Sequence, residues 1–153
     1  MSDIIALPTV DTQRLRLAIP SDPQDYSPSR DDYLFKRIPV YGEVDASFKD
    51  GELYLRVEKV IHETSHSTVF LSKINDFSVV VKCCDEGKFF DDFRKEANVY
   101  QRYLRDLQGF VVPRFFGYYE ALDEEYGPYS CLILEYCGTT VHDLFERLEP
   151  SEK

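Results

Sequence analysis

The segment from Thr68 to Cys84 reads TVFLSKINDFSVVVKCC and carries the clearest strand signals of the chain. Two runs rich in Val, Ile and Phe flank Asn75–Asp76, a polar pair typical of a tight turn. The pattern therefore predicts a hairpin of two antiparallel strands. The second run, Phe77 to Cys84, is rich in Val, which is typical of a buried strand. We expect this hairpin to form the buried part of a sheet.

The segments on either side extend the sheet. Leu53 to Ile61 alternates apolar and polar residues for much of its length, which predicts a strand ahead of the hairpin. From Phe89 to Leu107 the apolar residues recur at helical spacing, and Gly109 follows as a stop. The remaining predicted elements are strands at Val111–Glu120 and Tyr129–Tyr136 and a short helix at Val141–Leu148. Residues 51–148 thus predict an α+β domain, with a five-stranded antiparallel sheet and one main helix packed on it.

Residues 1–50 have a different pattern. Leu15, Leu17 and Ile19 alternate with other residues, which predicts a short edge strand. Residues 20–30 (PSDPQDYSPSR) are turn and loop material with three prolines, and the apolar residues of 33–44 are interrupted by Pro and Gly. We therefore expect 1–50 to be an N-terminal extension, partly loop, and 149–153 to be a tail.

Length and composition restrict the functional classes. The 153 residues suit one domain, and the net charge of −10 disfavours nucleic acid and anionic membranes as partners. No apolar run is long enough to span a membrane, and Met1–Pro8 lacks the features of a signal peptide, so we expect an intracellular protein, cytoplasmic or nuclear. The four cysteines lack the paired spacing of zinc ligands, so no metal site is expected.

Two charged residues suggest a specific kind of site. Lys82 ends the strand motif VVVK, and Glu96 lies on the predicted helix, 96 − 82 = 14 residues later. Each has an ordinary interpretation as a solvated side chain. However, the string FRKEANVYQRYLRDLQGFVVPRFFGYY around Glu96 resembles fungal-type protein kinase-like proteins. Over roughly residues 52–148 the chain resembles the small, N-terminal lobe of a protein kinase. The resemblance implies that Lys82 pairs nucleotide phosphates while Glu96 anchors it.

The segment LILEYCG, Leu132 to Gly138, is similar to the last small-lobe strand and the hinge that follows it. The resemblance implies a gatekeeper-like role for Leu134 and hinge roles for Glu135 and Cys137, beside which an adenine edge would bind. Together with Lys82 and Glu96 these two hinge residues are the nucleotide-binding candidates, and ATP is the implied cofactor. The alternative is a core strand followed by a turn.

Several kinase motifs are missing from the sequence. The segment VIHETSHSTVF stands where a glycine-rich loop is expected, and it contains no glycine. The catalytic motif H-R-D-x-x-x-x-N and the metal-binding D-F-G do not follow the hinge. We therefore expect no catalytic residue and no phosphate transfer by the chain as given.

Three hypotheses remain. The first is a pseudokinase-like, non-catalytic binding or regulatory module that meets a protein partner, or a second copy, through its hinge-side face. The second is the truncated N-terminal part of an active ATP-dependent fungal-type protein kinase. The third is an α+β protein with no nucleotide function.

Overall fold

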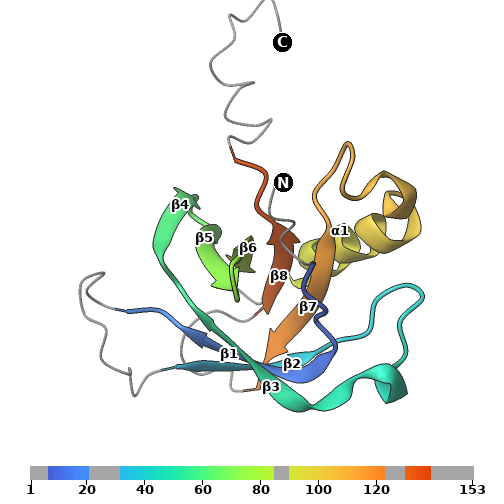
Figure 1. Ribbon diagram of the computed structural model, residues 1–153, viewed down its shortest axis with the longest axis horizontal. Helices are drawn as coiled ribbons and strands as arrows, with labels where there is room; N and C mark the ends of the chain where they lie inside the picture. The colour runs from blue at the N-terminus through green and yellow to red at the C-terminus, as the bar shows by residue number, and fades with distance from the viewer. Residues whose placement is uncertain (1–6, 21–31, 85–89, 123–129, 139–153) are drawn as a thin grey trace, which may run out of the picture.

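The computed structural model describes residues 7–20, 32–84, 90–122 and 130–138, which fold into one sheet and one main helix (Figure 1). The strands are β1 (Thr12–Ala18), β2 (Tyr33–Arg37), β3 (Lys49–Arg56), β4 (Lys59–Glu63), β5 (Ser67–Ile74), β6 (Phe77–Cys84), β7 (Phe115–Ala121) and β8 (Ser130–Glu135), and the helix is α1 (Phe90–Arg102). Short 3-10 turns lie at Asp45–Ser47 and Arg105–Leu107. The predicted helix at 141–148, the tail, the loops at 85–88 and 123–128 and most of the proline-rich loop lie outside the described residues.

The prediction of a five-stranded antiparallel sheet was wrong. The sheet has eight strands in the order β3-β1-β2-β7-β8-β6-β5-β4, and it is mixed because β1 pairs antiparallel with β2 and parallel with β3. The residues expected to form a mere extension supply β1 and β2. β1 is not an edge strand either, since it lies between two neighbours and its Leu15 and Leu17 are fully buried.

The sheet curls into a half-barrel because one extended segment serves both of its ends. β3 and β4 are consecutive in the chain, yet they form opposite ends of the strand order. Between them Val57 donates its N–H to Ala18 of the first end, and Glu58 donates to Leu71 of the other. The single strand predicted for Leu53–Ile61 is therefore split at Val57–Glu58, where the chain changes partners (Figure 1).

The two faces of the sheet bury two clusters. The interior of the curl is filled from both halves of the chain, by Leu15, Leu17, Phe35, Leu55, Val57, Phe70, Ile74, Val79, Val81, Cys83, Tyr119, Cys131 and Ile133. The other face packs against α1 through Val40, Cys84, Phe93, Ala97, Phe115, Tyr118, Leu132 and Leu134. The valine-rich strand β6 contributes to both faces by simple alternation, which agrees with its predicted burial and with its predicted bounds.

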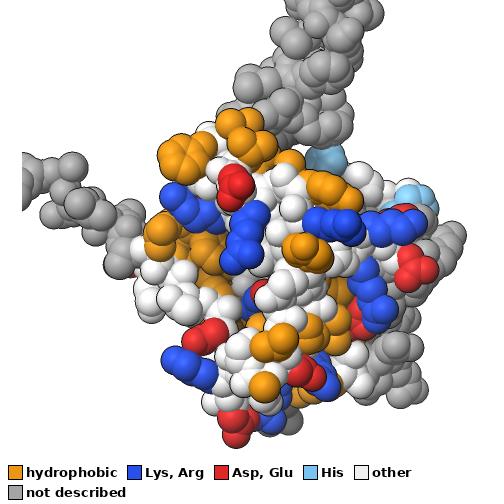
Figure 2. All heavy atoms as spheres, turned by 90° about the vertical axis from the view of Figure 1, so that its right-hand side faces the viewer, with side chains coloured by type: hydrophobic (Ala, Val, Ile, Leu, Met, Phe, Trp, Pro, Cys, Tyr) orange, Lys and Arg blue, Asp and Glu red, His pale blue; other side chains and the backbone are white. Residues whose placement is uncertain are grey.

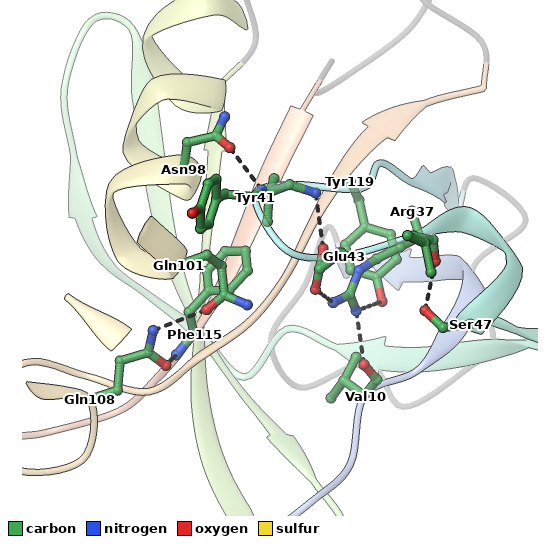
Figure 3. Close-up of polar contacts among 12 residues, drawn as sticks. Val10, Arg37, Tyr41, Glu43, Ser47, Asn98, Gln101, Gln108, Phe115 and Tyr119 are labelled. Atoms are coloured by element: carbon green, nitrogen blue, oxygen red, sulfur yellow. Dashed lines mark hydrogen bonds and ion pairs between the residues drawn. The ribbon is translucent and has the colours of Figure 1, made fainter. Parts of the chain in front are cut away.

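A buried arginine attaches the N-terminal segment to the sheet. Arg37 of β2 donates to the Val10 carbonyl at 2.9 Å, to the Tyr119 hydroxyl at 3.3 Å and to the Glu43 carboxylate at 2.6 Å (Figure 3). Its guanidinium occupies the space beside Gly117, where a Cβ would lie 2.5 Å from Arg37 Nη1. Only glycine therefore fits at this point of β7 without displacing the arginine.

The helix and the strand after it are shorter than predicted. α1 ends at Arg102, and a compact turn follows in which the Leu107 carbonyl accepts the N–H groups of Phe110, Val111 and Val112. These residues are therefore not free to begin a strand, and β7 starts only at Phe115. No helix in the described part of the chain has the length and apolar character needed to cross a membrane.

Candidate functional site

Lys82 and Glu96 meet in the structure. Lys82 Nζ lies 2.9 and 3.1 Å from the two carboxylate oxygens of Glu96, so one ammonium bonds both. The ammonium also lies 5.3 Å from the centre of the Phe93 ring, one helical turn earlier. The two side chains are about one-third exposed, at 30% and 32%, so a solvent-borne ligand can reach the pair. A strand and a helix thus bring together the two charges that the sequence analysis associated.

The position of Glu96 depends on how α1 is fixed to the sheet. Arg94 forms a two-bond pair with Glu120 of β7, and the Tyr118 hydroxyl donates to the same carboxylate at 2.9 Å. Burial raises the pKa of Glu120, but the hydrogen bonds from Arg94 and Tyr118 outweigh it and leave that pKa below its usual value. On the next turn of α1, Asn98 accepts the N–H of Tyr41 at 2.9 Å. These contacts fix the rotation of α1 and direct Glu96 towards β6.

Beside the ion pair, the helix-side face of the sheet carries a half-buried apolar strip. Strand pairing places His62, Val69, Lys82 and Leu132 in one row across the sheet and Lys59, Leu71, Val80 and Leu134 in the next. α1 packs on β7 and β8, so it covers only one side of this face. Val69, Leu71 and Val80 remain half-buried next to Lys82. The strip is suited to an apolar or planar group whose charged end reaches Lys82.

The β4–β5 hairpin beside this strip is closed on itself. Thr64 donates its N–H to the Ser67 carbonyl at 2.8 Å, and the Thr64 hydroxyl accepts the N–H groups of His66 and Ser67. A phosphate-binding loop works by presenting free backbone N–H groups to the ligand. Here the N–H groups of Thr64, His66 and Ser67 are used inside the turn, and the adjacent Glu63 carries negative charge. The hairpin is therefore poorly suited to hold a polyphosphate.

The predicted hinge residues are only partly free. The Glu135 side chain pairs with Arg114 at 2.7 Å, and its N–H donates to the Arg114 carbonyl at 2.9 Å. The N–H of Tyr136 donates to Ser78 at 3.1 Å. Neither N–H can therefore bond an adenine edge without breaking a sheet contact. Leu134, the gatekeeper-like residue, is buried, and it lies opposite Val80 and Phe115 in the strand pairing.

Cys137 is the exposed thiol of the hinge. The other three cysteines are buried, and Cys83 lies directly opposite Cys131 across β6 and β8. The Cys137 Sγ lies 3.8 Å from the Glu135 carbonyl oxygen. Burial, and after it the charge of Glu135, raises the pKa of the Cys137 thiol. Cys137 is thus a slow but accessible nucleophile at the border of the apolar strip.

The sequence analysis missed Arg114 and Gln108, which shape this region. Arg114 engages Glu135, and Gln108 bonds both α1 and β7. Neither residue stands in a periodic pattern, and a polar side chain in a turn is normally assigned to solvent, so no local signal could have identified their roles. In the described ranges no three His, Cys, Asp or Glu side chains are grouped so that they could hold a metal ion. The chain matches no protein-family model and no curated protein.

Proposed function

We propose that this chain is a kinase-like small lobe that works as a non-catalytic binding module. Its partner is a protein, which docks on the hinge-side face. This face consists of Val69, Leu71 and Val80, bordered by Tyr136 and Cys137. The observation that carries the proposal is the ion pair between Lys82 and Glu96, which joins a sheet strand to the helix as the resemblance implies. An intracellular location belongs to the same proposal.

The proposed function includes no nucleotide chemistry because of the groups that surround Lys82 and Glu96. The hairpin uses its N–H groups internally, and two hinge N–H groups are donated within the sheet. The 153 residues also contain no H-R-D-x-x-x-x-N and no D-F-G, the motifs that position the acceptor and hold the metal. A lysine fixed by a glutamate, without a phosphate cradle, supports a binding role without catalysis.

The surface next to the ion pair of Lys82 and Glu96 indicates the kind of partner that binds. The hinge-side face combines half-buried aliphatic side chains with the exposed Tyr136 and Cys137. Contiguous apolar surface of this kind marks interaction sites more often than free solvent-facing sheet. A protein segment lying along β5 and β6 would bury these aliphatic side chains.

Thermal unfolding with millimolar ATP and Mg²⁺ tests the nucleotide part. A ligand at 100 times its Kd stabilises the folded state by about 2.7 kcal/mol, which raises Tm by about 5–11 °C for a chain of this size. We expect no rise for the unmodified chain, for Lys82→Ala or for the control Lys36→Ala, an exposed lysine on β2. A rise that only Lys82→Ala abolishes would contradict the proposal.

Alkylation of Cys137 tests the partner part. If the partner is a second copy, the rate with iodoacetamide should fall as the protein concentration rises, and light scattering should show a growing mass. If the partner is another protein, the rate stays constant until that protein is added. A highly soluble monomer whose Cys137 remains equally reactive in an extract of its host cells would count against a docking face here.

The intact ion pair also favours a second candidate, part of an active ATP-dependent fungal-type protein kinase. Catalysis in protein kinases requires the strand lysine and the helix glutamate to be joined, and they are joined here. This candidate predicts an ATP-dependent rise in Tm and H-R-D and D-F-G motifs further along the reading frame. Sequencing the transcript beyond the codon for Lys153 separates the two candidates.

A further inference from the structure

The turn after α1 exposes apolar side chains to an unusual degree. Phe110 is 88% exposed, Val111 74%, Tyr103 67% and Leu107 42%. Figure 2 shows the side of the molecule on which α1 lies, where apolar side chains gather with Lys and Arg side chains among them. Four large apolar residues are thus exposed within nine positions of the chain, unlike an isolated exposed leucine.

The turn is held rigidly in this exposed conformation. Three successive N–H groups, those of Phe110, Val111 and Val112, converge on the Leu107 carbonyl. Gly109 has φ +83°, which favours glycine, and the guanidinium of Arg114 packs where its Cβ would stand. The hydrogen bonds of the turn therefore hold Phe110 in its exposed position. A turn that is already ordered loses little conformational entropy when a partner binds.

Gln108 fastens the same turn to both neighbouring elements. Its Nε2 donates to the Tyr100 carbonyl at 2.8 Å. The same Nε2 donates to Gln101 Oε1 at 3.1 Å, while Gln108 Oε1 accepts the Phe115 N–H at 2.9 Å (Figure 3). The side chain inside the turn is thus fully committed to the protein. By contrast, the side chains of Phe110 and Val111 in the same turn are mostly exposed to solvent.

The exposed turn adjoins two arginines, Arg102 and Arg105, that form no ion pair with a carboxylate of the described residues. The Arg102 guanidinium lies over the rings of Tyr41 and Tyr103, at 5.5 and 5.2 Å from their centres. Arg105 Nη1 lies 3.9 Å from where a Cβ on Gly42 would stand, so both arginines flank the same loop. Within the described ranges neither forms an ion pair with a carboxylate. By contrast, five other arginines do: Arg14, Arg16, Arg37, Arg94 and Arg114.

We propose that Arg102, Arg105 and the turn Leu107–Val111 form a docking surface for an acidic segment of another protein. The segment lays aromatic or aliphatic side chains against Phe110 and Val111, and its carboxylates pair with the two arginines. The two arginines favour a partner that brings carboxylates, and a second copy or an anionic membrane on the same surface are separate outcomes of the tests below. The inference does not rest on the proposed function, since neither Lys82 nor the hinge-side face takes part.

Peptide selection tests this surface. A random peptide library displayed on phage is selected against the whole 153-residue chain, and the enriched peptides are synthesised with a fluorescent label. We expect them to combine Asp or Glu with aromatic or aliphatic residues. Phe110→Ser should weaken their binding about tenfold or more, and the control Tyr54→Ser, an exposed aromatic on β3, should leave it unchanged.

The charges are tested separately. Arg102→Gln with Arg105→Gln should weaken the same peptides and reduce the dependence of Kd on salt, because fewer ionic contacts remain. The control pair Arg14→Gln with Lys36→Gln removes the same charge from the neighbouring strands β1 and β2 and should have no effect. Circular dichroism of every variant verifies folding.

Four outcomes would overturn the inference. The library yields no acidic peptides, or the enriched peptides bind Phe110→Ser as tightly as the unmodified chain. In the third outcome the chain dimerises in light scattering and Phe110→Ser makes it monomeric, so that the occupant is a second copy. In the fourth it sediments with phosphatidylserine–phosphatidylcholine vesicles and Phe110→Ser abolishes this, so that the occupant is a membrane.

Discussion

The buried pair of Arg37 and Glu43 offers the most exacting test of how the chain is held together. Replacing Arg37 by Met removes the donor to the Val10 carbonyl, to the Tyr119 hydroxyl and to the Glu43 carboxylate. The Arg37 side chain is only 4% exposed and that of Glu43 14%. Water therefore replaces these contacts poorly, and the substitution leaves the charge of Glu43 without its cation, although the carboxylate still accepts the Val40 N–H.

The expected cost is large compared with the total stability. Removing one partner of a buried ion pair costs about 3–5 kcal/mol, against a typical unfolding free energy of about 5–15 kcal/mol. For a chain of this length Tm falls by about 2–4 °C for each kcal/mol. Arg37→Met should therefore lower Tm by about 6–20 °C.

The assay is urea and thermal unfolding followed by circular dichroism, with Arg14→Met as the matched control. Arg14 also lies on a strand and pairs with a carboxylate, Asp50, at 3.1 Å. Both partners of this second pair are at least half exposed, so its loss should cost less than about 1 kcal/mol. If Arg37→Met and Arg14→Met destabilise the chain equally, burial of Arg37 does not have the role assigned to it.

Four further predictions concern the helix side of the sheet. Ellman's reagent should titrate one thiol in the folded chain and four after denaturation, since only Cys137 is exposed. Burial and the charge of Glu135 raise the pKa of the Cys137 thiol, so Glu135→Gln should lower that pKa and move the alkylation pH profile to lower pH; an unmoved profile contradicts this. Lys82→Met should change the unfolding free energy by less than about 1 kcal/mol, because both partners are about one-third exposed; a larger loss in urea unfolding would show a structural role that the geometry does not account for. Gln108→Leu should cost about 1–3 kcal/mol in the same assay, since the buried Phe115 N–H loses its acceptor, and an unchanged midpoint would count against a fixed turn.

Local signals in the sequence were sufficient for some elements and not for others. The valine content of β6 gave its bounds, Phe77–Cys84, because that strand is buried on both faces. The strand expected from Val111 starts only at Phe115, and no strand was predicted at Tyr33–Arg37. The structure brings Lys82 and Glu96 together, as the kinase resemblance implied, although no periodicity in the sequence links the two residues.

The overall sheet could not be predicted in this way. Leu15 and Leu17 indicate a strand, but alternation does not say which strands lie beside it, and the parallel partner β3 is more than thirty residues away. The change of partners at Val57 has no sequence signature, because an extended segment looks the same whether it pairs once or twice. A charged residue such as Arg37 on a strand is normally assigned to solvent, and its acceptors become visible only in three dimensions.

The curl explains why the candidate sites share one side of the molecule. β1, β2 and β3 fold over the face of the sheet opposite α1 and fill it with side chains from both halves of the chain. In the described part of the chain that face is occupied by the buried cluster in the interior of the curl. Lys82, Cys137 and the exposed turn therefore all lie on the helix side.

The same geometry predicts that residues 51–153 do not fold without residues 1–50. The shortened chain would lose Leu15, Leu17 and Phe35 from the interior of the curl. At about 1.5–3 kcal/mol for each buried side chain, this loss is about 5–9 kcal/mol, comparable to the stability of a whole domain. β3 would also lose β1, the strand with which it pairs. The test is urea unfolding of the shortened chain followed by circular dichroism. A cooperative transition like that of the full chain would show that 1–50 is a dispensable extension and that the curl contributes little to stability.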